Sequence, residues 1–182
     1  MELPGSRSER VKRHVLLVGL PGAGKTTVGG MVAAELGARF VDLDELIEEE
    51  QHATVREIFA RRGESVFREI EREAAGRVIN GRAAVLAPGG GWAAQPGAID
   101  AATARCLIVY LRTQPAEAAR RVGSGDTRPL LAGADHAERM RELLDVRAEF
   151  YARSEVTVDT DDRTPDDVAR EVAKLARSKA GW

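Results

Sequence analysis

One segment of the chain has the glycine, lysine and threonine spacing that is typical of a phosphate-binding loop. Residues 19–26 read Gly-Leu-Pro-Gly-Ala-Gly-Lys-Thr and fit the pattern G-x-x-x-x-G-K-[ST]. Glycines let backbone N–H groups turn inward around phosphate oxygens, while Lys25 reaches the terminal phosphates and the Thr26 hydroxyl binds Mg²⁺. A glycine-rich turn with a chance lysine is the alternative. The apolar run before the loop and the helical pattern after it favour binding of ATP or GTP.

Two aspartates follow the second apolar run, in Phe-Val-Asp-Leu-Asp at residues 40–44. Alternation along a strand places Asp42 and Asp44 on the same side, at the carboxyl end where open α/β sheets bind ligands. Such a pair can hold a magnesium-bound water and accept the proton of a hydroxyl nucleophile. The alternative is that they cap a helix beginning near Glu45, and Asp44 can do both.

Glu71 is a carboxylate on an otherwise apolar helical stripe, and Arg68 lies one turn before it. A core-facing carboxylate needs a partner, either an arginine or a ligand, although a plain surface pair is the alternative. Arg147 lies in the same way on the stripe that ends at Tyr151. It is predicted to be a buried guanidinium aimed at a carboxylate or phosphate, or else a snorkelling stem.

Two glycine-rich segments complete the candidate site. Gly89, Gly90 and Gly91 directly follow the third apolar run, where they permit close approach of the backbone to a ligand or simply form a flexible loop. Residues 123–133 contain three glycines, no helical or strand period, and Arg128. Such a segment with a charged residue is a candidate lid.

These residues must be positioned by the elements between which they lie. Five apolar runs are candidate strands, at residues 14–19, 39–42, 84–87, 106–111 and 155–159. Helical patterns separate them, with a C-cap at Gly37 and N-caps at Thr54, Asp135 and Thr164. Strands that alternate with helices predict an α/β fold with a parallel sheet and helices on both faces.

Composition bounds the class of protein. The 182 residues suffice for one domain, and 27 basic against 29 acidic residues lack the basic excess expected of a nucleic-acid-binding protein. Cys106 is the only cysteine, so a buried structural thiol and a reducing, cytoplasmic location are expected. No apolar stretch approaches the length of a membrane span. Residues 1–13 are expected to form a flexible tail before a single domain at 14–182.

Together the motifs resemble the shikimate kinase family from about Val15 to Leu175. They are G-L-P-G-A-G-K-T-T, F-V-D-L-D-x-x-I-E, G-E-x-x-F-R-x-I-E, the G-G-G turn, D-T-R-P-L-L and L-x-x-x-R-x-x-x-Y. The resemblance implies a P-loop kinase sandwich with strand order 2-3-1-4-5, a substrate-binding segment at about 43–80 and a lid at about 123–133. It implies transfer of the ATP γ-phosphoryl group to the 3-hydroxyl of shikimate, in aromatic amino acid biosynthesis, with Mg²⁺ as cofactor.

The resemblance also implies residue roles on the nucleotide side. The phosphate-binding residues are Gly22, Ala23, Gly24, Lys25, Thr26 and Thr27. Thr26 and Asp42 correspond to the residues that hold Mg²⁺, the second of them through water. The adenine site corresponds to Arg121, which stacks on the base, and to Arg163 and Pro165 at its border. Arg128 corresponds to the lid arginine that closes over the transferred phosphoryl group.

On the acceptor side, Asp44 resembles the base or orienting group for the 3-hydroxyl, and Arg68 with Arg147 resembles the pair that grips the shikimate carboxylate. Glu71 resembles the acid that binds a ring hydroxyl or orients Arg68, and residues 89–91 resemble the turn whose backbone contacts substrate. The catalytic set is then Asp44, Lys25 and Arg128. The partners implied are ATP and shikimate, acting on a monomer with no nucleic acid or membrane partner.

Two departures and two rival functions accompany this interpretation. Pro88 and Trp92 flank the glycine turn where the family often has small or polar residues, so Trp92 either reshapes the pocket or packs beneath it. One rival is another P-loop kinase, of gluconate or a nucleoside monophosphate, which lacks the Arg68, Glu71 and Arg147 set. The other is a non-catalytic nucleotide-binding relative, which is expected to have lost a catalytic group.

Overall fold

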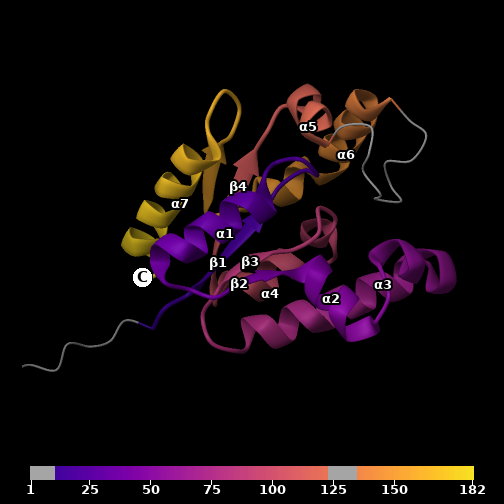
Figure 1. The fold of residues 1–182 in the computed structure, drawn as a ribbon, viewed down its shortest axis with the longest axis horizontal. Helices are drawn as coiled ribbons and strands as arrows, with labels where there is room; N and C mark the ends of the chain where they lie inside the picture. Colours follow the sequence, from indigo (N-terminus) through magenta and orange to yellow (C-terminus); the bar gives the residue numbers. More distant parts are fainter. Residues whose placement is uncertain (1–10, 123–134) are drawn as a thin grey trace, which may run out of the picture.

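A computed structural model describes residues 11–122 and 135–182 (Figure 1). The expected lid at 123–133, including Arg128, and residues 1–10 of the expected tail lie outside the described residues. Arg13, the last residue of the expected tail, is hydrogen-bonded to the folded domain. The backbone N–H of Arg13 donates to the carbonyl of Ala180, and the indole N–H of Trp182 donates to the carbonyl of Arg13 at 2.9 Å.

A five-stranded parallel sheet forms the centre of the molecule, in the order β2-β3-β1-β4-β5. This confirms the predicted sheet and its strand order. Val15 of β1 pairs with Val85 of β3 on one side and with Leu107 of β4 on the other, so β1 is the central strand. The strands are β1 (His14–Val18), β2 (Phe40–Asp42), β3 (Val85–Ala87), β4 (Cys106–Arg112) and β5 (Val156–Asp159).

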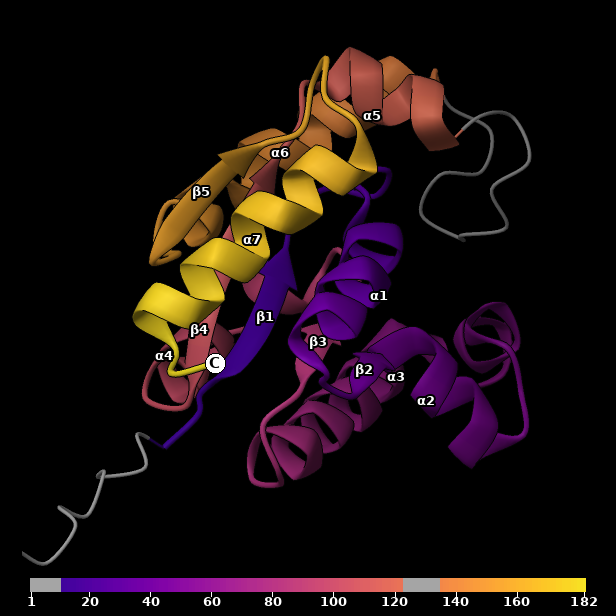
Figure 2. The same ribbon diagram turned by 60° about the vertical axis from the view of Figure 1, so that its left-hand side comes forward.

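Helices cover both faces of the sheet, because successive side chains of a strand point to opposite faces. Helices α1 (Lys25–Leu36) and α7 (Pro165–Lys179) lie on one face of the sheet and the other helices on the opposite face (Figure 2). Val15 and Leu17 of β1 accordingly pack in one apolar cluster with α1 and α7, whereas Leu16 and Val18 pack in a second cluster with residues of the other helices. The helices are α1 (Lys25–Leu36), α2 (Leu43–Gln51), α3 (Val55–Ile79), η1 (Trp92–Ala94), α4 (Ala98–Thr103), α5 (Pro115–Val122), α6 (His136–Tyr151) and α7 (Pro165–Lys179).

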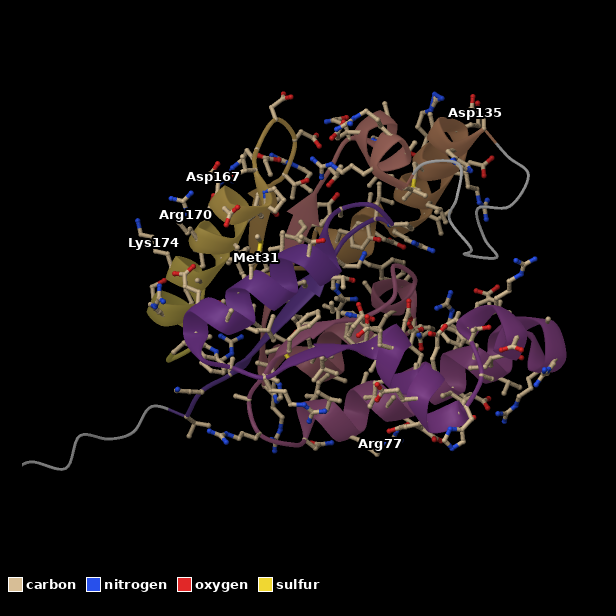
Figure 3. The ribbon with its side chains drawn as sticks, viewed as in Figure 1. Met31, Arg77, Asp135, Asp167, Arg170 and Lys174 are labelled. Atoms are coloured by element: carbon tan, nitrogen blue, oxygen red, sulfur yellow. The ribbon has the colours of Figure 1, made fainter. Side chains whose placement is uncertain are left out.

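The helix boundaries follow the local signals in the sequence. Gly37 ends α1 with a left-handed φ of 60°, and Thr54 opens α3 with the reciprocal capping box to Glu57. The hydroxyl of Thr164 accepts the first-turn N–H of α7, whose polar face carries Asp167, Arg170 and Lys174 toward solvent (Figure 3). Within α3, Gly63 has a φ of 82° and breaks the helix, so its second part begins near Glu64.

One further feature matches a compositional expectation. Cys106 is fully buried on β4, and burial raises the pKa of its thiol to about 12, so it packs as a small apolar residue. Every helix among the described residues is too short or too polar to cross a membrane.

Candidate active site

The phosphate loop joins β1 to α1 with a backbone that only glycine adopts readily. Gly22 has a φ of 79° and Gly24 a φ of 90°, and a Cβ on Gly22 would lie 2.4 Å from the carbonyl oxygen of Ala118. Helix α1 begins at Lys25, so its positive N-terminal end faces the loop. The ammonium of Lys25 is mostly buried and donates at 2.9 Å to the carbonyls of Gly19 and of its neighbour Leu20. The loop therefore has the form of an anion cradle.

Asp42 joins the phosphate loop to the second strand. Its Oδ2 accepts a 2.6 Å hydrogen bond from the hydroxyl of Thr26, and its Oδ1 caps α2 by accepting the N–H of Asp44 at 3.0 Å and of Glu45 at 3.4 Å. Asp42 and Asp44 line the same pocket, as expected. The argument from strand alternation was wrong, because β2 ends at Asp42 and Asp44 belongs to the first turn of α2. The helix cap is Asp42 itself.

The glycine turn after β3 lies against the charged residues of the acceptor side. A Cβ on Gly89 would lie 2.8 Å from Oε1 of Glu71 and 3.0 Å from Oδ1 of Asp44. A Cβ on Gly91 would lie 2.6 Å from Nη2 of Arg68. Only glycine therefore leaves these three side chains where they are. The turn brings an aspartate, a glutamate and an arginine from α2 and α3 to one place.

Arg147 reaches the same turn from α6. A Cβ on Gly90 would lie 3.2 Å from Nη1 of Arg147, and the hydroxyl of Tyr151, one turn along α6, donates to the Gly90 carbonyl at 3.1 Å. Arg147 is 6% exposed, and its buried Nη1 has no hydrogen-bond partner among the described residues. A buried guanidinium nitrogen requires an acceptor, which an anionic ligand at the turn would supply. The snorkelling alternative is wrong, because the charged end is buried.

Glu71 is fully buried, so the surface-pair alternative is also wrong. Its Oε2 accepts from Nη1 of Arg68 at 2.8 Å and from Nε2 of Gln95 at 2.6 Å, while Arg68 also pairs with Glu64 at 3.0 Å. Burial raises the pKa of Glu71 to about 7, and the nearby carboxylate of Asp44 adds to this rise, whereas Arg68 opposes it. The acceptor side thus contains a carboxyl group that titrates near neutral pH.

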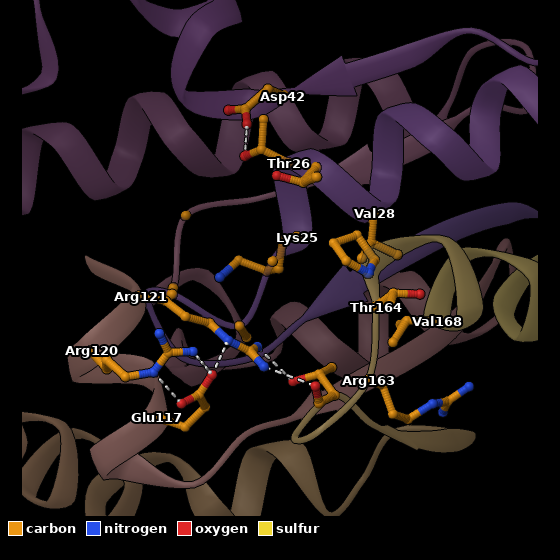
Figure 4. A pocket seen from close by; sticks show the side chains of 18 of the residues that line it. Lys25, Thr26, Val28, Asp42, Glu117, Arg120, Arg121, Arg163, Thr164 and Val168 are labelled. Atoms are coloured by element: carbon orange, nitrogen blue, oxygen red, sulfur yellow. Dashed lines mark hydrogen bonds and ion pairs between the residues drawn. The ribbon is translucent and has the colours of Figure 1, made fainter. Parts of the chain in front are cut away.

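A pocket of about 930 Å³ joins the phosphate loop to the glycine turn (Figure 4). Its walls include residues 22–28 of the loop and helix α1, Asp42, Asp44, residues 88–90 and residues 162–165. Thr27 and Pro165 therefore line the same pocket as Lys25. Arg68, Glu71, Gly91 and Arg147 adjoin it through the glycine turn rather than lining it.

Arg121 lies in the pocket wall in a fixed orientation. Its Nε donates to Glu117 at 2.8 Å, and its two terminal nitrogens donate to the hydroxyl and the carbonyl of Thr160 at 2.9 and 2.8 Å (Figure 4). A guanidinium held along three of its edges offers its flat face to a ligand. Arg163 also lines the pocket, but its guanidinium pairs with Glu171 at 2.7 Å.

Several residues of the site were missed from the sequence. Glu117 precedes Arg121 by one helical turn, a spacing that signals the pair, but Thr160 and Gln95 carry no such signal because their partners are distant in the chain. Trp92 is 2% exposed, belongs to the apolar core, and is not among the described residues that line the pocket. It packs beneath the turn, whereas Pro88 does line the pocket.

Comparison with known proteins identifies the family. A family model described as shikimate kinase matches residues 21–177. The chain belongs to the shikimate kinase family. A shikimate kinase of Moorella thermoacetica is 39% identical over 91% of this chain and 95% of its own length, and one of Mycobacterium ulcerans is 43% identical over 85% and 84%. A solved shikimate kinase from Acinetobacter baumannii, in complex with shikimate, superposes with a TM-score of 0.88 at 33% identity, over 96% of this chain and 98% of that one.

Membership of the shikimate kinase family confirms the predicted enzyme class, an ATP-dependent phosphotransferase with an alcohol acceptor. It also favours this interpretation over the rival gluconate-type kinase and over a non-catalytic relative. The predicted P-loop kinase fold agrees with the superposition, since the described sheet has the order 2-3-1-4-5.

Proposed function

We propose that the chain transfers the γ-phosphoryl group of ATP to the 3-hydroxyl of shikimate, which yields shikimate 3-phosphate and ADP. The observation that carries this proposal is the glycine turn at 89–91, against which an aspartate, a glutamate and two arginines converge beside a phosphate loop. A carboxylate-bearing polyol presents the complementary groups, which are one anion and several hydroxyls.

The two arginines would hold the shikimate carboxylate. Nη1 of Arg147 is buried and lacks a protein acceptor among the described residues, and Arg68 is oriented by Glu64 and Glu71. Guanidinium groups bind carboxylates in a planar, charge-assisted geometry, so the substrate ring would be fixed in orientation as well as in place. Phosphoryl transfer depends chiefly on such positioning and on charge stabilisation.

Asp44 would orient the 3-hydroxyl and accept its proton as the oxygen attacks the phosphorus atom. It lines the pocket and lies beside Gly89, which places it between the phosphate loop and the glycine turn. Glu71 faces the same glycine through Oε1 and would accept a hydrogen bond from a second ring hydroxyl. The acceptor would thus be held by groups of both charges.

The nucleotide would lie along the loop and the pocket wall. The backbone N–H groups of residues 22–27 and the ammonium of Lys25 would bind the phosphates, and Arg121 would stack on adenine near Arg163 and Pro165. We assign the neutralisation of developing charge and the exclusion of water to Arg128 and the segment around it, which lie outside the described residues.

Thr26 and Asp42 would hold Mg²⁺. Both offer hard oxygen ligands, and the Thr26 hydroxyl directs its hydrogen at Asp42 across 2.6 Å, which leaves its lone pairs for a cation. When bound, the ion would screen phosphate charge. We further propose a monomer in the cytoplasm that acts on small molecules alone.

The deciding experiment is an assay of ADP release by the purified chain with ATP and Mg²⁺, with shikimate, gluconate or a nucleoside monophosphate as acceptor. Turnover is expected only with shikimate, and mass spectrometry should identify a monophosphorylated product. A Lys25→Met variant serves as the control for contaminating kinases, because it lacks the loop ammonium. ADP release that does not depend on shikimate would overturn the proposal.

A further inference from the structure

Gln95 follows η1 and reaches the buried carboxylate of Glu71 on α3. Its Nε2 donates at 2.6 Å to Oε2, the same oxygen that accepts from Arg68 at 2.8 Å. Gln95 is 6% exposed and Glu71 is fully buried, so water does not compete for either group. An ionised carboxylate only accepts hydrogen bonds, which requires that the amide nitrogen of Gln95 face it. Two donors from separate elements therefore occupy Oε2.

The other oxygen of Glu71 lies against the glycine turn. Oε1 is buried without a hydrogen-bond partner among the described residues, and it faces Gly89, where a Cβ would lie 2.8 Å away. Gly89 lines the pocket. Because Oε2 is fixed by Arg68 and Gln95, the carboxylate cannot rotate freely about its last bond. This fixes the direction in which Oε1 is presented.

We infer that Gln95 is a positioning residue for the acceptor, because its amide fixes Glu71 so that Oε1 faces Gly89 in the wall of the cleft. The inference rests on the proposed function, in which Glu71 binds a ring hydroxyl of shikimate. The backbone of Gln95 is itself held by the turn. Its main-chain N–H donates to the main-chain carbonyl of Trp92 at 3.0 Å, and the side chain of Trp92 is buried in the core. Packing of Trp92 in the core thus helps to position the side-chain amide of Gln95.

The charged groups around Glu71 explain why one neutral donor matters. Arg68 on α3 and Arg147 on α6 favour its ionised form, whereas Asp44 on α2 and burial disfavour it. These influences leave the pKa of Glu71 at about 7. Near neutral pH, the loss of a donor to the carboxylate changes the fraction of enzyme in which Glu71 can accept a hydrogen bond from substrate.

The first test is Gln95→Met, which keeps the length of the side chain and removes the donor. The acid limb of kcat/KM for shikimate should move up by about one pH unit, since a hydrogen bond to a charged group shifts a pKa by roughly that amount. At pH 7, KM for shikimate should rise about tenfold, while KM for ATP stays within about twofold. Gln51→Met is the matched control, because within residues 11–122 and 135–182 the side chain of Gln51 bonds only Arg62, outside the cleft, at 3.1 Å.

The second test is Gln95→Glu, whose introduced carboxyl group donates only while it is protonated. Shikimate binding should then weaken as pH rises above the pKa of the introduced carboxyl group, because two ionised carboxylates would repel each other, whereas binding by Gln95→Met should improve as pH rises. A residue that only supports the fold would not make binding fall with rising pH in one variant and improve with rising pH in the other. Thermal unfolding of each variant shows whether it is folded at the assay temperature.

The outcomes separate the inference from the function on which it rests. Absence of shikimate-dependent turnover in the unmodified chain would remove both. Turnover in the unmodified chain, with a folded Gln95→Met variant whose KM and acid limb are unchanged, would overturn the inference alone. If Gln95→Met does not fold, the pH profile of Gln95→Glu decides. If neither folds, the side-chain amide NMR signal of Gln95 in the unmodified chain should titrate near pH 7, and a flat response would count against the role.

Discussion

The hydroxyl of Thr26 donates a 2.6 Å hydrogen bond to the carboxylate of Asp42, which ties the start of α1 to the end of β2. The same aspartate caps α2, the helix that carries Asp44. The proposed magnesium site and the proposed acceptor site therefore share one carboxylate. A substitution of Asp42 should therefore affect both the proposed magnesium site and the proposed acceptor site.

Asp42→Asn should raise the Mg²⁺ concentration needed for half-maximal activity by about 10–100-fold, the usual cost of losing a group that holds a metal through water. The fold should persist, because asparagine caps helices about as well as aspartate. Activity measured across a Mg²⁺ series checks this. Asp135→Asn is the control, since Asp135 caps α6 in the same way. An unchanged Mg²⁺ requirement in Asp42→Asn would exclude the metal role.

Gly91→Ala should weaken shikimate binding without unfolding the protein. The new methyl group would lie 2.6 Å from Nη2 of Arg68, at the flexible end of that side chain, so the guanidinium moves rather than the backbone. KM for shikimate should rise about 10–100-fold, as for a lost charged hydrogen bond, with KM for ATP unchanged.

The matched control for this variant is Gly76→Ala in α3, where a Cβ would meet nothing within 4 Å. It should stabilise the protein by about 0.5–1 kcal/mol, because alanine favours a helix interior over glycine, and it should leave both KM values alone. Equal effects of the two substitutions on KM for shikimate would rule out the proposed contact with Arg68.

Glu71→Gln should change how stability depends on pH. The pKa of Glu71 is raised from about 4.5 to about 7 in the folded state, so between these values the unfolded chain releases a proton that the folded chain keeps. The free energy of unfolding of the unmodified protein therefore falls as pH rises through this window, by on the order of 3 kcal/mol. The free energy of unfolding of Glu71→Gln should not show this decrease.

Chemical denaturation at pH 4.5 and pH 8 measures the difference. The stability of Glu71→Gln relative to the unmodified protein should increase between the two values. The exposed Glu73, two residues along α3, provides the control through Glu73→Gln, which should track the unmodified protein. Parallel stabilities of Glu71→Gln and the unmodified protein would show that Glu71 ionises normally in the folded state.

Glu117→Gln should raise KM for ATP about fivefold, because it removes the charge that fixes Nε of Arg121 at 2.8 Å. KM for shikimate should not change, since Glu117 lines the pocket with Arg121, on the proposed nucleotide side. Steady-state kinetics with each substrate varied in turn checks this. Glu50→Gln controls for loss of a surface ion pair, with Arg77, away from the nucleotide. A rise in KM for shikimate alone would contradict the assignment.

The sequence predicted those parts of the molecule that local patterns determine. All five strands, the capping box at Thr54 and the phosphate loop depend on neighbours in the chain, and the structure places them within a residue or two of their predicted bounds. The burial of Glu71 and Arg147 was also predictable, because a charge on an apolar stripe must be buried or paired.

What escaped prediction depends on contacts between distant segments. Gln95 meets Glu71 only because the turn after β3 folds back onto α3, and Thr160 meets Arg121 only because β5 lies beside β4. The alternation argument for Asp44 failed for a related reason, since the length of β2 is set by its pairing with β3 rather than by its own residues.

The central position of β1 has a consequence for how the chain acquires its structure during synthesis. Val15 is synthesised before its two neighbours in the sheet, Val85 and Leu107, which follow only after helices α2 and α3 have been made. Closing such long loops is costly, so the nascent β1 stays unpaired with its apolar side chains exposed. Chaperone capture and aggregation of the nascent chain should therefore be most frequent before β4 has emerged from the ribosome. Substitutions of residues in the candidate active site should change their frequency least.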